Sequence, residues 1–141
     1  MESERSGRTF DILIVEDERL VALSIALLIS QAPGFRVTGR AATMEEALAL
    51  ADRDPPHLAL VDVHLGKKQC GLDVARALCE RDIACLFLTG NPPKEPLPDL
   101  AIGCLAKPFH DNSLLAALAI ARARAGGTAI VDGVPPDLRL Y

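Results

Sequence analysis

The sequence predicts an α/β fold, a doubly wound parallel sheet of five strands with helices on both faces. Strand-like aliphatic runs alternate with helical segments at intervals of about 20 to 25 residues, the spacing of right-handed strand–helix–strand units. Runs such as LALV at 58–61 are apolar at every position, which is typical of strands covered on both sides. The 141 residues, 50% of them hydrophobic, suffice for one core, and we expect a single domain over residues 10–125.

The first half of the chain contains three of the expected strands and two helices. Residues 1–9 are mostly charged or small and lack apolar periodicity, so we expect a disordered leader there. Apolar residues recur at helical spacing over 18–31, and a second helix over 44–53 begins after Thr43, which is a good N-cap residue. The strands that flank these helices are DILIVE at 11–16, FRVTG at 35–39 and HLALVD at 57–62.

The second half continues this alternation with one interruption. Helices are expected over 71–80 and 113–125, and strands over 84–90 and 102–106. The intervening segment NPPKEPLPDL at 91–100 holds four prolines, and a proline inside a helix costs about 3 kcal/mol. We therefore expect the fourth helix of the series to be reduced to a loop or a single turn.

The tail at 126–141 follows the last expected helix. It contains a Gly pair, a candidate short strand TAIV at 128–131 and a Pro-Pro turn. Three alternatives stay open from the sequence: the tail packs on the sheet edge, pairs two copies into a homodimer, or is disordered. It is too short for a helix-turn-helix domain, so no DNA-binding output domain is expected.

Composition argues against nucleic-acid and membrane partners. The net charge is −4, and the 15 Lys and Arg residues form no dense basic patch. The longest near-continuous apolar run, 20–29, is about half of the roughly 20 residues that a membrane span needs. The 4 cysteines form no C-x-x-C pair and no signal-like stretch opens the chain, so we expect reduced thiols in a cytoplasmic protein: Cys70, Cys79, Cys85 and Cys104.

Polar residues terminate the expected strands at one edge of the sheet. They are Glu16, Asp17, Asp62, Thr89 and Lys107. In doubly wound sheets, ligands bind at the carboxyl ends of the strands where the strand order reverses. Carboxylates about 5 Å apart repel by roughly 3 kcal/mol per pair at an effective dielectric of about 20, which favours a hard cation such as Mg²⁺. An aspartate beside Mg²⁺, a hydroxyl and an amine is equipped for phosphoryl transfer.

These residues, in this order, resemble a response-regulator receiver domain of two-component signalling over about residues 10–124. The pattern is an acidic pair in ILIVEDE, an aspartate in LALVDVHL, a threonine in LFLTG and the Lys-Pro of LAKPF. The resemblance implies a CheY-like, flavodoxin-like (β/α)5 fold and, because no output domain is expected, a stand-alone type.

The resemblance also implies the role of each site residue. Asp62 accepts a phosphoryl group from a sensor histidine kinase or a histidine phosphotransferase, and Thr89 and Lys107 contact the phosphoryl oxygens. Glu16, Asp17, Asp62 and the backbone carbonyl of His64 hold Mg²⁺. Lys-Pro is commonly a cis bond in this family, which directs Lys107 into the site.

Three features depart from the family pattern. Cys104 occupies the position, three before the lysine, that is usually an aromatic switch residue. The segment FLTG at 87–90 partly resembles the F-A-T-G-x-Y signature of a subgroup of single-domain receivers, but Leu88 replaces alanine and no tyrosine follows. The loop after Asp62 is about one residue longer than usual, and 66–68 is expected to be mobile and basic.

Several functional alternatives remain open. The side chains of His64 and Asn91 either tune the lifetime of the acyl phosphate or simply face solvent. Output runs through an unknown downstream protein or through draining phosphoryl groups as a sink, and a degenerate receiver would act without phosphorylation. A phosphatase of the haloacid-dehalogenase type needs an acid two residues after its nucleophile, where this chain has His64. A flavodoxin-like binder needs a Gly- or Ser-rich phosphate loop where EDERL stands.

Overall fold

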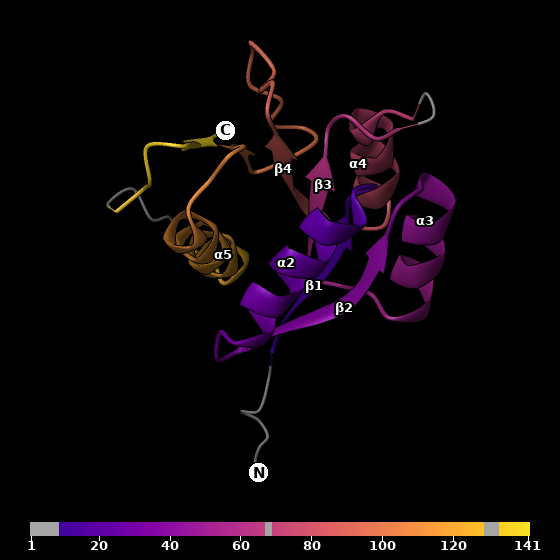
Figure 1. Cartoon of the computed structure of the whole chain (residues 1–141), viewed down its shortest axis with the longest axis horizontal. Coiled ribbons are helices and arrows are strands. Elements are labelled where there is room, and N and C mark those ends of the chain that lie inside the picture. Colours follow the sequence, from indigo (N-terminus) through magenta and orange to yellow (C-terminus); the bar gives the residue numbers. More distant parts are fainter. Residues whose placement is uncertain (1–8, 67–68, 129–132) are drawn as a thin grey trace.

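The computed structural model describes residues 9–66, 69–128 and 133–141. Within these residues four helices surround a six-stranded sheet in the order β2-β1-β3-β4-β5-β6, which confirms the doubly wound α/β fold (Figure 1). The strands are β1 (Phe10–Val15), β2 (Phe35–Ala41), β3 (Leu58–Asp62), β4 (Ala84–Thr89), β5 (Gly103–Ala106) and β6 (Leu138–Leu140). The helices are α2 (Arg19–Ser30), α3 (Met44–Arg53), α4 (Gly71–Cys79) and α5 (Asp111–Ala125). None of these helices is long and apolar enough to cross a membrane.

The core lies in two layers, one on each face of the sheet. Successive residues of a strand point to opposite faces, so Ile12 and Ile14 join the layer beneath α2 and α5, whereas Leu13 and Val15 join the layer beneath α3 and α4. Figure 1 shows the helices divided in this way, with α3 and α4 on one side of the sheet. This double cover explains why the central strands are apolar at every position.

The strand order reverses between β1 and β3. From β1 the chain crosses through α2 to β2 on one side, and from α3 it returns to β3 on the other side of β1. Both pairings are parallel, so the carboxyl ends of β1 and β3 lie next to each other. The expected ligand-binding edge is therefore the edge where Glu16 and Asp62 stand.

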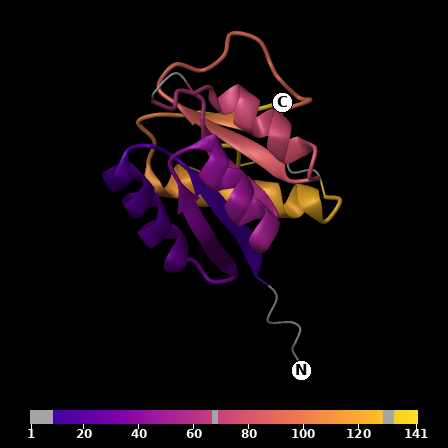
Figure 2. The ribbon, with the colours of Figure 1, turned by 90° about the vertical axis from the view of Figure 1, so that its right-hand side faces the viewer.

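The connection from β4 to β5 contains no helix, as its prolines predict. Residues 90–102, all of which are described, form a loop with one turn, in which the amides of Leu100 and Ala101 donate to the carbonyl of Leu97. Figure 2 shows this loop arching over one end of the sheet. The reduced fourth helix is therefore confirmed.

The tail supplies a strand that the sequence did not predict. Residues 138–140 pair antiparallel with β5 and form the sixth strand, so the prediction of five strands was one short. Of the three alternatives for the tail, packing on the sheet edge is the one observed. The strand candidate at 128–131, the leader and the basic residues Lys67 and Lys68 lie outside the described residues, apart from Thr9 and Thr128.

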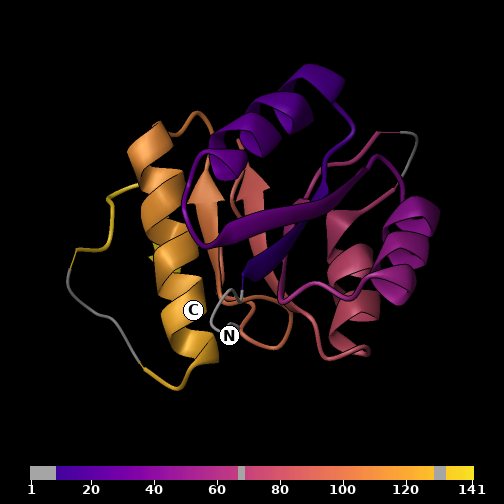
Figure 3. The same cartoon turned by 90° about the horizontal axis from the view of Figure 1, so that it is seen from below.

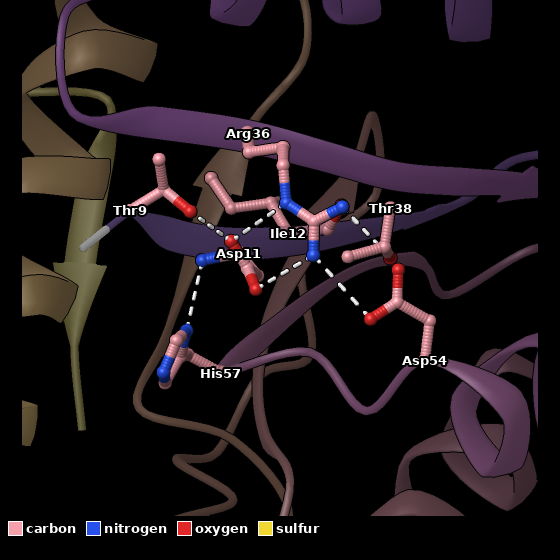
Figure 4. Close-up of polar contacts among 7 residues, drawn as sticks. All are labelled: Thr9, Asp11, Ile12, Arg36, Thr38, Asp54 and His57. Carbon is pink, nitrogen blue, oxygen red and sulfur yellow. Dashed lines mark hydrogen bonds and ion pairs between the residues drawn. The ribbon is translucent and has the colours of Figure 1, made fainter. Parts of the chain in front are cut away.

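A cluster of polar contacts ties the start of β1 to its neighbours (Figure 4). The Arg36 guanidinium donates to both carboxylate oxygens of Asp11, at 3.1 and 2.9 Å, and reaches Asp54 at 3.3 Å. The Asp11 amide donates to Nδ1 of His57 at 2.8 Å, and Thr9 donates to the Asp11 carboxylate. These contacts hold the start of β1 and its neighbouring segments together, at the end of the sheet opposite the acidic residues.

The Asp11 cluster predicts a dependence of stability on pH. The hydrogen bond from Arg36 is the main reason why the pKa of Asp11 is lowered. A lowered pKa stabilises the fold above the unfolded value of about 4, and this contribution is lost as the pH falls through the folded value. Because Arg36 is 47% exposed, Asp11→Asn should cost only about 1 kcal/mol at pH 7, measured by urea unfolding.

The cost of Asp11→Asn should shrink as the pH falls below about 4, where the unfolded state becomes protonated, and it should vanish below the lowered folded pKa, where Asp11 is protonated in both states. Asp73→Asn, which removes a carboxylate that is 65% exposed, is the matched control and should change little at either pH. A cost for Asp11→Asn that stays constant between pH 7 and pH 3 would contradict the assignment.

Candidate functional site

Three carboxylates meet at the carboxyl ends of β1 and β3. Glu16 and Asp17 follow β1, Asp62 is the last residue of β3, and each offers an oxygen within 4.8 Å of the others. The Glu16 side chain is fully buried and that of Asp62 is 10% exposed, whereas Asp17 is the most accessible of the three. The structure thus brings together the acids that the sequence places at separate strand ends.

Lys107, which directly follows β5, reaches this cluster with its side chain. Its amide donates to the carbonyl of Thr89 at 2.9 Å, and the Lys107–Pro108 bond is cis. The ammonium lies 2.5 Å from Oε1 of Glu16 and 3.3 Å from Oδ2 of Asp62. Burial lowers the pKa of Lys107, but the hydrogen bonds and charges of the two carboxylates outweigh burial and raise the pKa overall.

Glu16 is the most strongly desolvated acid of the cluster. Burial raises its pKa, and the hydrogen bond from Lys107 offsets this only in part. Its other carboxylate oxygen accepts the amide of Glu18 at 3.1 Å, at the N-cap of α2. Sequence reasoning assigned Lys107 to phosphoryl oxygens and missed this ion pair with Glu16.

The loop after β3 orients Asp62. Oδ1 of Asp62 accepts the His64 amide at 3.0 Å, which leaves Oδ2 facing Lys107. The Gly66 amide donates to Asp17 at 2.8 Å, and the Gly71 amide donates to the carbonyl of Val63 at 2.8 Å. The loop is therefore tied both to the acidic cluster and to the strand from which it leaves.

Gly71 allows α4 to begin directly against this loop. A Cβ on Gly71 would lie 2.1 Å from the backbone oxygen of Asp62 and 2.7 Å from Cα of Val63. Both distances are too short for non-bonded atoms, so only glycine fits at position 71 without displacement of the backbone. The start of α4 and the backbone of the acidic residue are thus in direct contact.

Thr89 ends β4, the strand next to β3. It is fully buried, and its hydroxyl accepts the amide of Asn91 at 3.0 Å. The side chains of Asn91 and His64 are exposed, so each could face either solvent or a bound group. Both alternatives for these two side chains stay open.

The donor set fits Mg²⁺. With the three acids ionised and Lys107 protonated, the cluster carries a formal charge of −2. Carboxylate oxygens are the ligands that this ion prefers, and a dication balances that charge. We expect Glu16, Asp17, Asp62 and the carbonyl of His64 to supply the ligands.

Cys104 lies outside the acidic cluster, in the middle of β5. It is buried, pairs with Phe87 of β4 on one side and with Arg139 of β6 on the other, and burial raises its pKa. The ring of Tyr141 packs in the same core layer, and burial raises the pKa of Tyr141 to about 12. The alternation in LRLY after the Pro-Pro turn was the sequence signal for this strand, and it was missed.

Comparison with known protein families identifies the domain. Residues 12–119 match the response regulator receiver domain. The positive alginate biosynthesis regulatory protein of Pseudomonas aeruginosa is 37% identical over 113 residues, which cover 77% of this chain and 45% of that protein. The phyllosphere-induced regulator PhyR of Methylorubrum extorquens is 32% identical over 115 residues, which cover 77% of this chain and 42% of that protein. The chain spans less than half the length of these two relatives.

Solved structures agree with this assignment. The anti-anti-sigma factor PhyR from Bartonella quintana has a TM-score of 0.73 at 26% identity, covering 84% of this chain and 49% of that chain. A CheY-like receiver domain protein from Methanospirillum hungatei has a TM-score of 0.73 at 22% identity, covering 84% of this chain and 98% of that chain, and shows the shared fold. The chain belongs to the receiver domains of two-component response regulators.

Proposed function

We propose that this receiver accepts a phosphoryl group on Asp62. The observation that supports the proposal most directly is the arrangement of its carboxylate, which has one oxygen held by the His64 amide and the other facing Lys107. The surrounding cluster has a formal charge of −2, which an added dication would balance. In this proposal Asp62 is the nucleophile and Glu16 and Asp17 hold the metal.

The side chains of the site divide the chemistry among themselves. Oδ2 of Asp62, the oxygen that faces Lys107, attacks the phosphorus, and the bond between phosphorus and the leaving group of the donor breaks. Lys107, already 3.3 Å from Asp62, and the hydroxyl of Thr89 donate to the phosphoryl oxygens. Mg²⁺ held by Glu16, Asp17 and Asp62 would neutralise negative charge on the carboxylates and the phosphoryl group.

Intact mass spectrometry tests this function. The chain is incubated with acetyl phosphate, a small phosphodonor, with and without Mg²⁺. We expect a gain of one phosphoryl group only with the metal. If neither acetyl phosphate nor a phosphorylated protein donor transfers a group, the proposal is wrong and the reading as a phosphorylation-independent module takes its place.

The surface beside the site fits a protein phosphodonor. Helix α2 begins next to the acidic pair and exposes a stripe of leucines: Leu20 (81% exposed), Leu23 (40%) and Leu27 (56%). A groove of about 290 Å³ lies beside the stripe, lined mainly by α2 and by Phe109, Asp111 and Leu114 at the start of α5. We propose that a helix of a sensor histidine kinase or a histidine phosphotransferase docks here.

The docking proposal predicts that a substitution on α2 slows phosphorylation by a protein donor but not by acetyl phosphate. Leu20→Asp places a charge in the centre of an apolar contact and should slow phosphotransfer from the phosphorylated protein donor by tenfold or more. The rate with acetyl phosphate should stay within twofold, because the acidic cluster is untouched. Stopped reactions followed by intact mass measure both rates.

A charge change elsewhere is the control for Leu20→Asp. Arg76→Asp on α4 alters a side chain that is 61% exposed and should leave both rates near those of the unmodified chain. Equal slowing of both donors by Leu20→Asp would place its effect in the acidic site instead.

Output through a protein partner is the other part of the proposal. The similar Bartonella protein is an anti-anti-sigma factor, and the similar Pseudomonas protein is a positive regulator of alginate biosynthesis. We infer that this chain signals by protein binding in the cytoplasm rather than by direct contact with nucleic acid, consistent with its net charge of −4.

A further inference from the structure

The segment 137–141, which we name the strap, runs along the free edge of β5. At its start the Ala106 amide donates to the carbonyl of Asp137 at 2.9 Å, and at its end the Tyr141 amide donates to the carbonyl of Ile102 at 2.9 Å. Between them β6 pairs antiparallel with β5. Figure 3 shows the described end of the tail, in yellow, beside α5. Without the strap, β5 would be an exposed edge strand.

The strap covers both faces of the sheet edge. Leu138, only 6% exposed, and Leu140 pack in the core layer beneath α2 and α5. Tyr141 packs in the opposite layer with Cys104 and Phe87. The recognition elements are therefore backbone hydrogen bonds together with apolar side chains that alternate along the strand.

The strap is held imperfectly. Among the described residues, two buried side-chain oxygen or nitrogen atoms have no hydrogen-bond partner, and both are in the strap: Oδ1 of Asp137 and the hydroxyl of Tyr141. Each such group costs about 1 to 3 kcal/mol. Closing the strap therefore desolvates two polar atoms that gain no hydrogen bond, which offsets part of the free energy gained from its backbone hydrogen bonds and apolar contacts.

Gly103 gives the edge of β5 a shape that admits a strand. A Cβ on this residue would lie 2.5 Å from the oxygen of Arg139 and 3.2 Å from Cα of Leu140. The three nearest atoms all belong to the strap, so a side chain here would obstruct the added strand first. A substitution at position 103 should therefore disturb the contact between β5 and the strap.

We propose that the edge of β5 is a strand-addition surface, closed by the strap, that takes an extended segment of a partner protein. The segment adds antiparallel to β5 in place of β6, with apolar side chains where Leu138 and Leu140 lie and an aromatic one at the place of Tyr141. A partner that satisfies the two polar positions gains the free energy that the strap loses there. The strap and the partner compete for one edge.

The edge of β5 is connected to the acidic site through two consecutive residues, Ala106 and Lys107. Ala106 donates to the strap, and the next residue, Lys107, donates its amide to Thr89 and its ammonium to Glu16 and Asp62. If Lys107 rearranges on phosphorylation, we expect the strap to respond, and we expect release of the strap to alter the position of Lys107 in turn. This linkage, unlike the strand-addition surface itself, rests on the proposed function.

Hydrogen exchange measured by NMR on the full chain tests the strap. In Gly103→Ala the Ala106 amide should exchange at least tenfold faster than in the unmodified chain, while the Lys107 amide, which faces β4, stays protected. Gly126→Ala is the matched control, because its Cβ would meet its nearest atoms at an ordinary 3.6 Å. Equal protection of Ala106 in both variants would overturn the strap assignment.

A peptide added in trans tests the surface. Leu138→Asp removes a buried anchor of the strap but keeps Gly103, so a fluorescent peptide with the sequence of residues 133–141, GVPPDLRLY, should bind it more tightly than the unmodified chain. Adding Gly103→Ala to Leu138→Asp should abolish that binding. Binding that survives the second substitution, or its absence in a folded Leu138→Asp protein, overturns the proposal. Circular dichroism verifies that Leu138→Asp is folded. If it is not, the proposal is tested by the hydrogen exchange of the Ala106 amide in Gly103→Ala.

The linkage has its own readout. The initial rate of phosphorylation by acetyl phosphate should change at least threefold in Gly103→Ala relative to Gly126→Ala. An unchanged rate with a released strap refutes the linkage and leaves the surface intact. Failure of the unmodified chain to be phosphorylated refutes the proposed function without affecting the exchange and peptide results.

Discussion

Asp62→Asn is expected to abolish the Mg²⁺-dependent gain of a phosphoryl group. The amide has no nucleophilic carboxylate oxygen, and the substitution removes one of the three negative charges that the metal would balance. The side-chain oxygen of asparagine can still accept the His64 amide, and Lys107 keeps its contact with Glu16. We therefore expect loss of phosphorylation without loss of the fold, measured by intact mass and by urea unfolding.

Asp73→Asn is the matched control for this substitution. Asp73 lies on α4, is 65% exposed and belongs to a surface pair with Arg76, so its removal should leave phosphorylation unchanged. A phosphoryl group that still appears in Asp62→Asn at the rate of the control would move the acceptor to another residue. Peptide mapping would then locate it.

Gly71→Ala is expected to destabilise the protein and to disrupt the acidic site together. Its Cβ would lie 2.1 Å from the backbone oxygen of Asp62, so either α4 or the end of β3 must move. Because backbone rather than a flexible side chain is in the way, we expect a loss of about 3 kcal/mol or more. The displaced β3 end would also misplace Asp62 and slow phosphorylation at least tenfold.

Gly90→Ala separates this clash from a general effect of replacing glycine. Gly90 also follows a strand end, but no atom lies within 4 Å of the position of its Cβ. Urea unfolding and the rate with acetyl phosphate should therefore stay near those of the unmodified chain. If Gly71→Ala behaves like Gly90→Ala in both measurements, the tight contact between α4 and Asp62 is wrong.

The acidic cluster could be predicted because its evidence is local. The apolar run of β3 ends in Asp62 and that of β1 ends before Glu16, and the topology of parallel sheets brings these ends together. The loop between β4 and β5 was predictable for a similar reason, since four prolines in one short segment exclude a helix. In each case the residues that cause the structure, the acids at the strand ends and the prolines in the loop, can be recognised in the sequence itself.

The remaining features depend on long-range packing. The segment LRL at 138–140 has only modest strand propensity, and it forms β6 because the free edge of β5 and Gly103 admit it. The ion pair of Lys107 with Glu16 joins residues 91 positions apart and follows from the burial of both side chains. The roles of the individual site residues stay predictions until phosphorylation is measured.

The proline-rich loop between β4 and β5 has a consequence for the unfolded chain. A proline restricts its own backbone before folding begins, so a compatible loop loses less conformational entropy when it becomes ordered. Residues 90–102 can therefore hold one shape over the end of the sheet without the hydrogen bonds of a helix. Part of the order of this loop is thus encoded in how few shapes the denatured chain can adopt, rather than in contacts of the folded one.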